Sequence, residues 1–214
     1  MIQYTQERRW VMQMAGRRAA WNQTRYEAYL KSGRGRGRGQ GEGVDYLPWI
    51  SIHDFSSKGL SSRVYGHKSR RIHHFLSWNE LYFFYILEWS DKVLDIREQF
   101  PLLDMELAID VAQRAGVKYP RNNASGFPYL LTCDFMITTE NGLKARTIKS
   151  ISDLKNKRTL EKLEIERRYW NELGIDCYWT RNWLSKSKAY WMASYCGYVT
   201  RNPFRLWISQ SHIN

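Results

Sequence analysis

The dipeptide Asn141-Gly142 constrains the fold of this chain more strongly than any other feature. It lies in the stretch TCDFMITTENGLKARTIKS, residues 132–150, between two segments rich in Thr and Ile. Both central positions of a two-residue hairpin turn require positive φ, so Asn-Gly predicts two antiparallel strands joined at this point. A loop of these two residues places Asp134 directly opposite Lys149, at the end of the hairpin that is far from the turn.

Side chains alternate along a strand, which puts Asp134, Thr147 and Lys149 on one face of this hairpin. The other face is apolar and is expected to be core: Cys133, Phe135, Ile137 and Ile148. The polar face has two interpretations. One is a cross-strand salt bridge worth ~0.2–1 kcal/mol. The other is a metal-dependent nuclease site, in which a carboxylate holds a divalent ion and a lysine lies near the attacking water or the phosphate.

Composition narrows the class of partner. The chain has 214 residues, a net charge of +12 and 15% aromatic residues. The aromatic content excludes overall disorder, and the length fits one domain with appendages. The positive charge predicts a polyanionic partner, with nucleic acid before an anionic membrane surface. No apolar run reaches the ~18 residues of a membrane span, and the N-terminal residues lack a signal-peptide pattern, so we expect a cytoplasmic protein.

Cysteine and histidine spacing gives no support for a zinc site or a disulfide framework. The three cysteines are far apart in the sequence, and the five histidines lack a metal-ligand pattern. They are Cys133, Cys177 and Cys196, and His53, His67, His73, His74 and His212. Free thiols are therefore expected.

Four segments are predicted along the chain. They are a basic helical N-terminal arm (1–32), a Gly/Arg-rich linker (33–45), a catalytic domain (46–197) and a C-terminal tail (198–214). The arm either docks on DNA or packs on the domain. The tail is either a docking segment for a partner or a last strand of the core. The linker, GRGRGRGQGEG, is expected to be flexible until bound, either as a plain spacer or with phosphate contacts from Arg34, Arg36 and Arg38.

A second basic segment, RVYGHKSRRIHHF, spans residues 63–75. Its cations and interleaved aromatic residues suit contact with a nucleic-acid backbone, which positions DNA without reading its sequence. The predicted phosphate contacts are Arg63, Lys68, Arg70 and Arg71. The competing interpretation is a basic face that is merely solvated.

The order of elements predicts the fold class. Ser77 and Glu80 form a capping box before the apolar run LYFFYILEW, which indicates a buried helix. The further predicted elements are a strand at 93–100, a helix near 105–115, the hairpin, a helix capped by Ser152 or Asp153 and ending at Gly174, a strand in GIDCYWT, and a helix at 183–195 capped by Asn182. This order is typical of an α/β fold with a mixed central sheet flanked by helices.

The same residues resemble the TnsA family, the endonuclease subunits of heteromeric bacterial transposases. The resemblance is carried by HHFLSWNEL, LEWSDKVLDIREQFPLL, TCDFMIT and RTLEKLEIERRYW, and it extends over residues 33–179. It implies a restriction-endonuclease-like core that binds two Mg²⁺ ions, for which Mn²⁺ substitutes. It also implies that the protein cuts DNA at transposon ends.

The resemblance assigns the catalytic residues Glu80, Asp134 and Lys149. Glu80 and Asp134 would also bind metal. The family usually has glutamine two positions before the lysine, but this chain has Thr147 there. A hydroxyl is a weaker ligand than an amide oxygen, so the carbonyl of Ile148 is a further candidate ligand.

By resemblance, the protein hydrolyses the 5′ strand at each transposon end, in the bacterial cytoplasm and in association with the nucleoid. Its partners would be double-stranded DNA, a TnsB-type DDE transposase and a TnsC-type AAA+ ATPase regulator. Two alternatives stay open. One is a non-catalytic architectural DNA-binding subunit, which the loss of the glutamine favours. The other is a stand-alone restriction or junction-resolving nuclease, which would cut without helpers.

Overall fold

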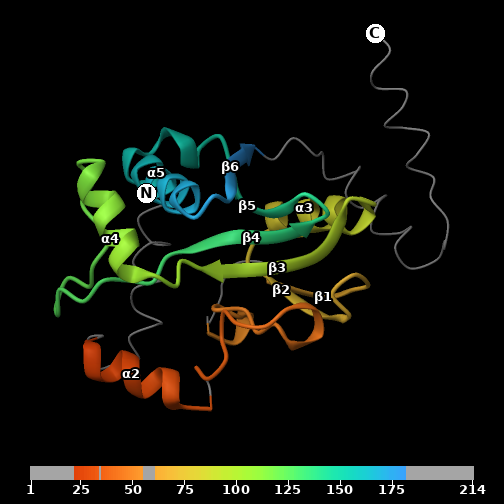
Figure 1. Ribbon diagram of the computed structural model, residues 1–214, viewed down its shortest axis with the longest axis horizontal. Helices are drawn as coiled ribbons and strands as arrows, with labels where there is room; N and C mark the ends of the chain where they lie inside the picture. Colours follow the sequence, from red (N-terminus) through yellow and green to blue (C-terminus); the bar gives the residue numbers. More distant parts are fainter. Residues whose placement is uncertain (1–21, 34, 55–60, 182–214) are drawn as a thin grey trace, which may run out of the picture.

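The computed structural model describes residues 22–33, 35–54 and 61–181 (Figure 1). Predictions that fall on residues 1–21, on Arg34 or on residues 182–214 lie outside these ranges. The main sheet has the order β3-β4-β5-β6, in which β3, β4 and β5 are antiparallel and β6 runs parallel to β5. Their bounds are Val93–Pro101, Thr132–Thr139, Gly142–Lys149 and Asp176–Arg181. The predicted mixed sheet is confirmed.

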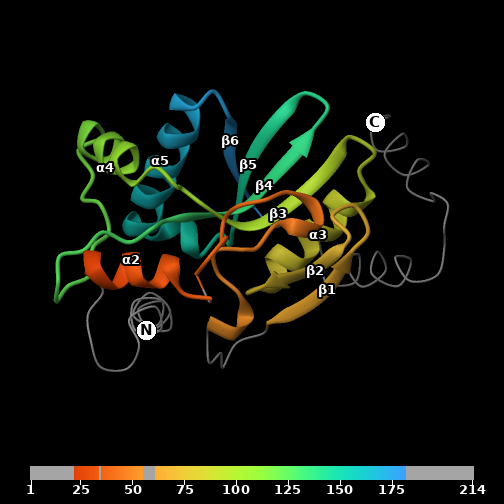
Figure 2. The ribbon, with the colours of Figure 1, turned by 60° about the horizontal axis from the view of Figure 1, so that its bottom comes forward.

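Both faces of the sheet are covered (Figures 1 and 2). One face packs against α3 (Trp78–Trp89) and a separate two-stranded hairpin, β1 (Ser62–Gly66) and β2 (Arg71–Phe75). The other face packs against α4 (Met105–Arg114) and α5 (Lys157–Glu172) around Met136 and Ala145. The side chains of alternate residues of β4 and β5 therefore enter two different cores.

The local predictions for the helices hold in most places. Ser77 is the N-cap of α3, because its side chain accepts the backbone N–H of Glu80. The strand predicted at 93–100 and the helix predicted near 105–115 are confirmed as β3 and α4. The predicted cap of α5 was wrong. Asn156 caps this helix, while the residues before it form the short helix η3 (Asp153–Lys155).

The register of the β4–β5 hairpin differs from the prediction. Thr139 pairs with Gly142, so the loop is Glu140-Asn141, one residue earlier than expected. Gly142 has a φ of +99° and opens β5, and its carbonyl accepts the hydroxyl of Thr139 at 2.9 Å. Each partner moves by two positions, which leaves Asp134, Thr147 and Lys149 on one face as predicted. The sequence therefore placed Asp134 and Lys149 on the correct face with the wrong partners. Cys133 differs from the prediction, because it packs in the core of Met136 and Ala145 and not with Phe135 and Ile137.

The Gly/Arg-rich segment packs on the domain, which differs from the flexible linker that was expected. Gly39 has a φ of +74°, and a Cβ there would lie 2.4 Å from Pro101. The guanidinium of Arg38 donates to the carbonyl of Trp49 at 2.9 Å and pairs with Asp54. Glycine allows this close approach because it has no side chain to clash. The short helices η1 (Gly43–Asp45) and η2 (Ile52–Asp54) follow.

The helix α2 (Gln23–Lys31) precedes this segment and begins at the N-cap Asn22. The rings of Tyr26 and Tyr29 contact Trp49 with centroids 6.3 and 5.9 Å apart. This part of the predicted arm therefore packs on the domain. Within the described residues Cys133 and Cys177 are free thiols. No helix in the described ranges is long and apolar enough to cross a membrane.

Candidate active site

Three secondary-structure elements bring the predicted residues together. Glu80 lies in the first turn of α3, Asp134 lies in β4, and Lys149 is the last residue of β5. Lys149 Nζ lies 3.4 Å from Asp134 Oδ2. The charges of Asp134 and Lys149 both act on the pKa of Glu80, which places all three side chains in one electrostatic cluster.

Glu80 is held by the cap of its own helix and by a neighbouring strand. Ser77 Oγ donates to Glu80 Oε1 at 2.6 Å, and the Leu76 N–H donates to Oε2 at 3.1 Å. Gln99 Nε2, from β3, donates to the same Oε2 at 3.3 Å. Burial and the charge of Asp134 raise the pKa of Glu80 to about 7, although the hydrogen bonds from Ser77 and Leu76 oppose the shift. The capping box thus orients a carboxylate that has been removed from solvent.

Asp134 is oriented by β5. Its Oδ2 accepts the backbone N–H of Ile148 at 2.7 Å and lies near the ammonium of Lys149. Burial works to lower the pKa of Lys149, but the surrounding carboxylates outweigh it, so this pKa is raised above its ordinary value. Lys149 therefore keeps its proton at neutral pH beside Asp134.

Sequence reasoning missed a fourth member of the cluster, Glu166 of α5. It is buried, and its carboxylate accepts the hydroxyl of Thr147. Burial raises the pKa of Glu166 to about 8, and the charge of Asp134 adds to this shift. The helical pattern could have indicated this residue. Glu166 lies on the buried face of α5 with Leu163, Tyr169 and Trp170, where charged residues are rare unless they are paired.

The donor set fits a hard divalent cation. Asp134 and Glu80 offer carboxylate oxygens, and the carbonyl of Ile148, a residue whose N–H contacts Asp134, stays a predicted ligand. Three carboxylates share one lysine here; burial raises the pKa values of Glu80 and Glu166, and the charge of Asp134 adds to both shifts. Within the described ranges, no group of three or more His, Cys, Asp and Glu side chains forms a ready-made metal centre. Main-chain or water oxygens would therefore have to complete the coordination of an ion.

The predicted ligand Thr147 has a different partner in the structure. Its hydroxyl donates to Glu166 and is thus committed to α5. A metal contact from Thr147 stays a prediction. It would use a lone pair of the hydroxyl oxygen, whose proton is already in the hydrogen bond to Glu166.

The predicted phosphate contacts divide into two groups. Arg36, Arg63 and Arg70 are exposed, Lys68 is half-buried, and none of these four has a side-chain hydrogen bond or ion pair to the described residues. Arg38 and Arg71 have partners inside the protein, so phosphate contacts from these two stay a prediction that would compete with internal ion pairs. Arg38 pairs with Asp54, and Arg71 is buried against Glu98. Both guanidinium groups serve the fold in this structure.

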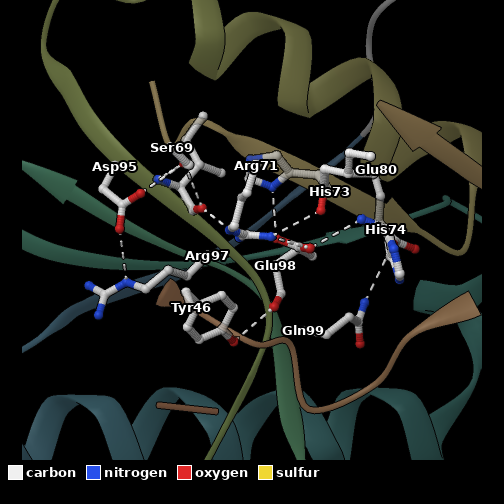
Figure 3. A network of polar contacts seen from close by, with 12 residues as sticks. Tyr46, Ser69, Arg71, His73, His74, Glu80, Asp95, Arg97, Glu98 and Gln99 are labelled. Carbon is white, nitrogen blue, oxygen red and sulfur yellow. Dashed lines mark hydrogen bonds and ion pairs between the residues drawn. The ribbon is translucent and has the colours of Figure 1, made fainter. Parts of the chain in front are cut away.

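A buried polar network lies next to the cluster, between β2 and β3 (Figure 3). The carboxylate of Glu98 accepts two hydrogen bonds from Arg71 and the backbone N–H of His74, and it lies 2.7 Å from His73 Nδ1. Burial favours the neutral acid, but Arg71 and His73 outweigh it and lower the pKa of Glu98 to about 2. The network also contains Tyr46, whose hydroxyl donates to the Glu98 carbonyl at 3.0 Å. It fixes β2, and hence the start of α3, onto β3.

Comparison with known proteins agrees with this geometry. The family profile for the TnsA-like endonuclease N terminal matches residues 90–179, a range that contains Asp134, Lys149 and Glu166. Transposon Tn7 transposition protein TnsA of Escherichia coli is 40% identical over 165 residues, which are 76% of this chain and 58% of that protein. The chain thus spans a little over half the length of this relative. The mixed sheet with helices on both faces is consistent with a restriction-endonuclease-like fold, and residues 90–179 match the TnsA-like endonuclease family.

Proposed function

We propose that this protein is a metal-dependent DNA endonuclease subunit of a transposase, and that it hydrolyses a phosphodiester bond at transposon ends. The observation that carries the proposal is the contact of Lys149 with Asp134 beside the buried Glu80. An isolated salt bridge would not need a second and a third carboxylate, Glu80 and Glu166, at the same place. The similarity to a transposition protein supplies the biological setting.

The chemistry follows from the positions of the side chains. Two Mg²⁺ ions, held by Asp134 and Glu80 with the carbonyl of Ile148, would supply an activated water and neutralise charge on the phosphate. The Ile148 N–H keeps the Asp134 carboxylate in place. Lys149 retains its proton, and it would orient the nucleophilic water or stabilise the charge that develops on the scissile phosphate. The products would be a 5′-phosphate and a 3′-hydroxyl.

The proposed partners rest on the similarity to a transposition protein. The protein would cut the 5′ strand of each end, while a TnsB-type DDE transposase cuts and joins the 3′ strand under a TnsC-type ATPase. Phosphate contacts would come from Arg36, Arg63, Lys68 and Arg70, the predicted cations that are not committed inside the fold. Phosphate contacts carry no sequence information, so the end sequence would be read by a partner.

A second candidate function is an architectural subunit that binds DNA without cutting it. The observation that favours it is the Thr147 hydroxyl, which bonds to Glu166 where the family has a glutamine. This candidate predicts normal DNA binding and normal assembly, with no strand cleavage under any condition.

Cleavage of labelled transposon-end DNA tests the proposal. The reaction is run in Mg²⁺ and in chelator, with and without the transposase and ATPase subunits. We expect 5′-strand cleavage in Mg²⁺ with the partners present, and a loss of at least about a hundredfold in Asp134→Ala, because the group that orients the reacting centre is gone.

The matched control is Asp91→Ala, an exposed aspartate at the turn between α3 and β3, which should cleave as the unchanged protein does. Normal cleavage by Asp134→Ala would reject the site. Binding without cleavage by the unchanged protein would favour the architectural function. Cleavage without partners would favour the stand-alone nuclease.

A further inference from the structure

Gln99 has a backbone conformation that its strand does not explain. It lies within β3, yet its φ is +49°, in the left-handed region that non-glycine residues rarely adopt. The neighbouring pairs Glu98–Phe135 and Phe100–Cys133 keep one register, so Gln99 stands across from Asp134. A strained residue therefore faces the central carboxylate of the site.

The unusual φ sends three consecutive side chains to three different elements. Glu98 reaches Arg71 of β2, Gln99 reaches Glu80 at the start of α3, and the ring of Phe100 packs 5.9 Å from that of Trp170 in α5. Regular alternation along a strand would send Gln99 to the face opposite its two neighbours. The left-handed turn instead delivers an amide to Glu80.

The Gln99 side chain is fixed at both ends. It is 2% exposed, its Nε2 donates to Glu80 Oε2 at 3.3 Å, and its Oε1 accepts the hydroxyl of Thr132 at 3.3 Å. The ionised carboxylate of Glu80 only accepts hydrogen bonds, so the amide nitrogen of Gln99 faces Glu80 and the amide oxygen accepts the hydroxyl of Thr132. The Gln99 carbonyl also accepts the N–H of Trp49 at 3.3 Å, which holds the strained backbone.

On the basis of the function proposed above, we infer that Gln99 is a positioning residue that holds the Glu80 carboxylate toward Asp134. Strained backbone persists where the surrounding structure demands it, and it gathers at functional sites. An amide that donates to Oε2 of Glu80 fixes the direction of this carboxylate and leaves its remaining lone pairs for a cation. The chain thus keeps a glutamine in the site although Thr147 occupies the place where its family usually has one.

Gln99→Gly separates function from stability. Glycine removes the amide and also relieves the strained φ, so the melting temperature should stay close to that of the unchanged protein. Mn²⁺ affinity, measured by titration calorimetry without DNA, should fall about tenfold or more, and 5′-strand cleavage should fall with it. Gln113→Ala, an exposed glutamine of α4, is the control and should change neither.

A double-mutant cycle shows whether Gln99 acts through Glu80. In a Glu80→Ala background, Gln99→Gly should cause no further loss of Mn²⁺ affinity, because its partner is absent. An additive loss would assign Gln99 a general structural role and overturn the inference. Unchanged Mn²⁺ affinity in Gln99→Gly would also overturn it, even if Asp134→Ala abolishes cleavage and the proposed function stands.

Thr132→Val decides the question if Gln99→Gly does not fold. This variant keeps the shape of the side chain and replaces the hydroxyl that holds the amide oxygen of Gln99 with a methyl group. We expect a smaller fall in Mn²⁺ affinity, of about threefold, because the Gln99 side chain is then held at one end only. An affinity equal to that of the unchanged protein would count against the inference.

Discussion

Glu98 and Glu166 are both buried glutamates of one domain, yet their surroundings give them opposite electrostatics. Glu98 is matched by Arg71 and His73, which lower its pKa to about 2. Glu166 receives one hydroxyl, from Thr147, and burial raises its pKa to about 8. The first carboxylate is neutralised within the fold, whereas the second belongs to a cluster that lacks compensating positive charge. A buried acid with its own cation holds a fold together, while a cluster without one is suited to a cation from solution.

The largest expected effect is the difference in stability between two matched substitutions. Glu98→Gln should lower the free energy of unfolding by about 3 kcal/mol, because it leaves the buried Arg71 without its counter-charge. For a chain of this size, that corresponds to a melting temperature lower by about 6–12 °C. Glu166→Gln should change stability by less than about 1 kcal/mol, since an amide oxygen can still accept the Thr147 hydroxyl. Thermal unfolding followed by circular dichroism measures both, and equal losses would remove the distinction between the two regions.

Low pH should destabilise the protein partly by protonating Glu98. Its pKa is lowered from 4.5 to about 2 on folding, so its contribution to stability is complete above pH ~4.5 and is lost as the pH falls toward 2. This contribution to the free energy of unfolding is about 3 kcal/mol. Urea unfolding between pH 5 and 2 should therefore show a shallower decline for Glu98→Gln than for the unchanged protein.

Glu164 has a pKa lowered to about 2 as well, through its hydrogen bonds to Arg167 and Arg168. It is present in both proteins, so the difference between the two unfolding curves isolates Glu98. Curves that run parallel over the whole pH range would show that the Arg71–His73–Glu98 network does not supply this acid sensitivity.

The sequence predicted the parts of the site that depend on short-range rules. The capping box placed Glu80 at the start of α3, while the resemblance assigned it to the site. Strand alternation placed Asp134 and Lys149 on one face despite a register error of two positions. Alternation survives such an error because it has a period of two. Glu166 could not be assigned to the site in this way, since it reaches Thr147 from a helix nineteen positions further along the chain.

The basic segments show a second limit of prediction from the sequence. Arg70 and Arg71 are adjacent and chemically identical, and only the hairpin β1–β2 separates their roles. Arg71 pairs across the hairpin with the buried Gly66 and points inward to Glu98, whereas Arg70 lies in the exposed turn with a φ of +53°. Charge density indicates that a segment is basic. It does not show which cations the fold will use for itself.

The smallest expected effect is a change in the salt dependence of DNA binding, and substitutions of these two arginines test it. Arg70→Gln should reduce the dependence of log affinity for DNA on log salt by about one and leave the melting temperature unchanged, because one phosphate contact is lost and no internal one. Arg71→Gln should instead destabilise the fold, as Glu98→Gln does. Lys118→Gln, an exposed lysine between α4 and β4, is the control for a general change in charge. Fluorescence anisotropy with duplex DNA at several salt concentrations measures the slope. A slope that changes equally in Arg70→Gln and Lys118→Gln would mean that the turn of the hairpin has no special contact with DNA.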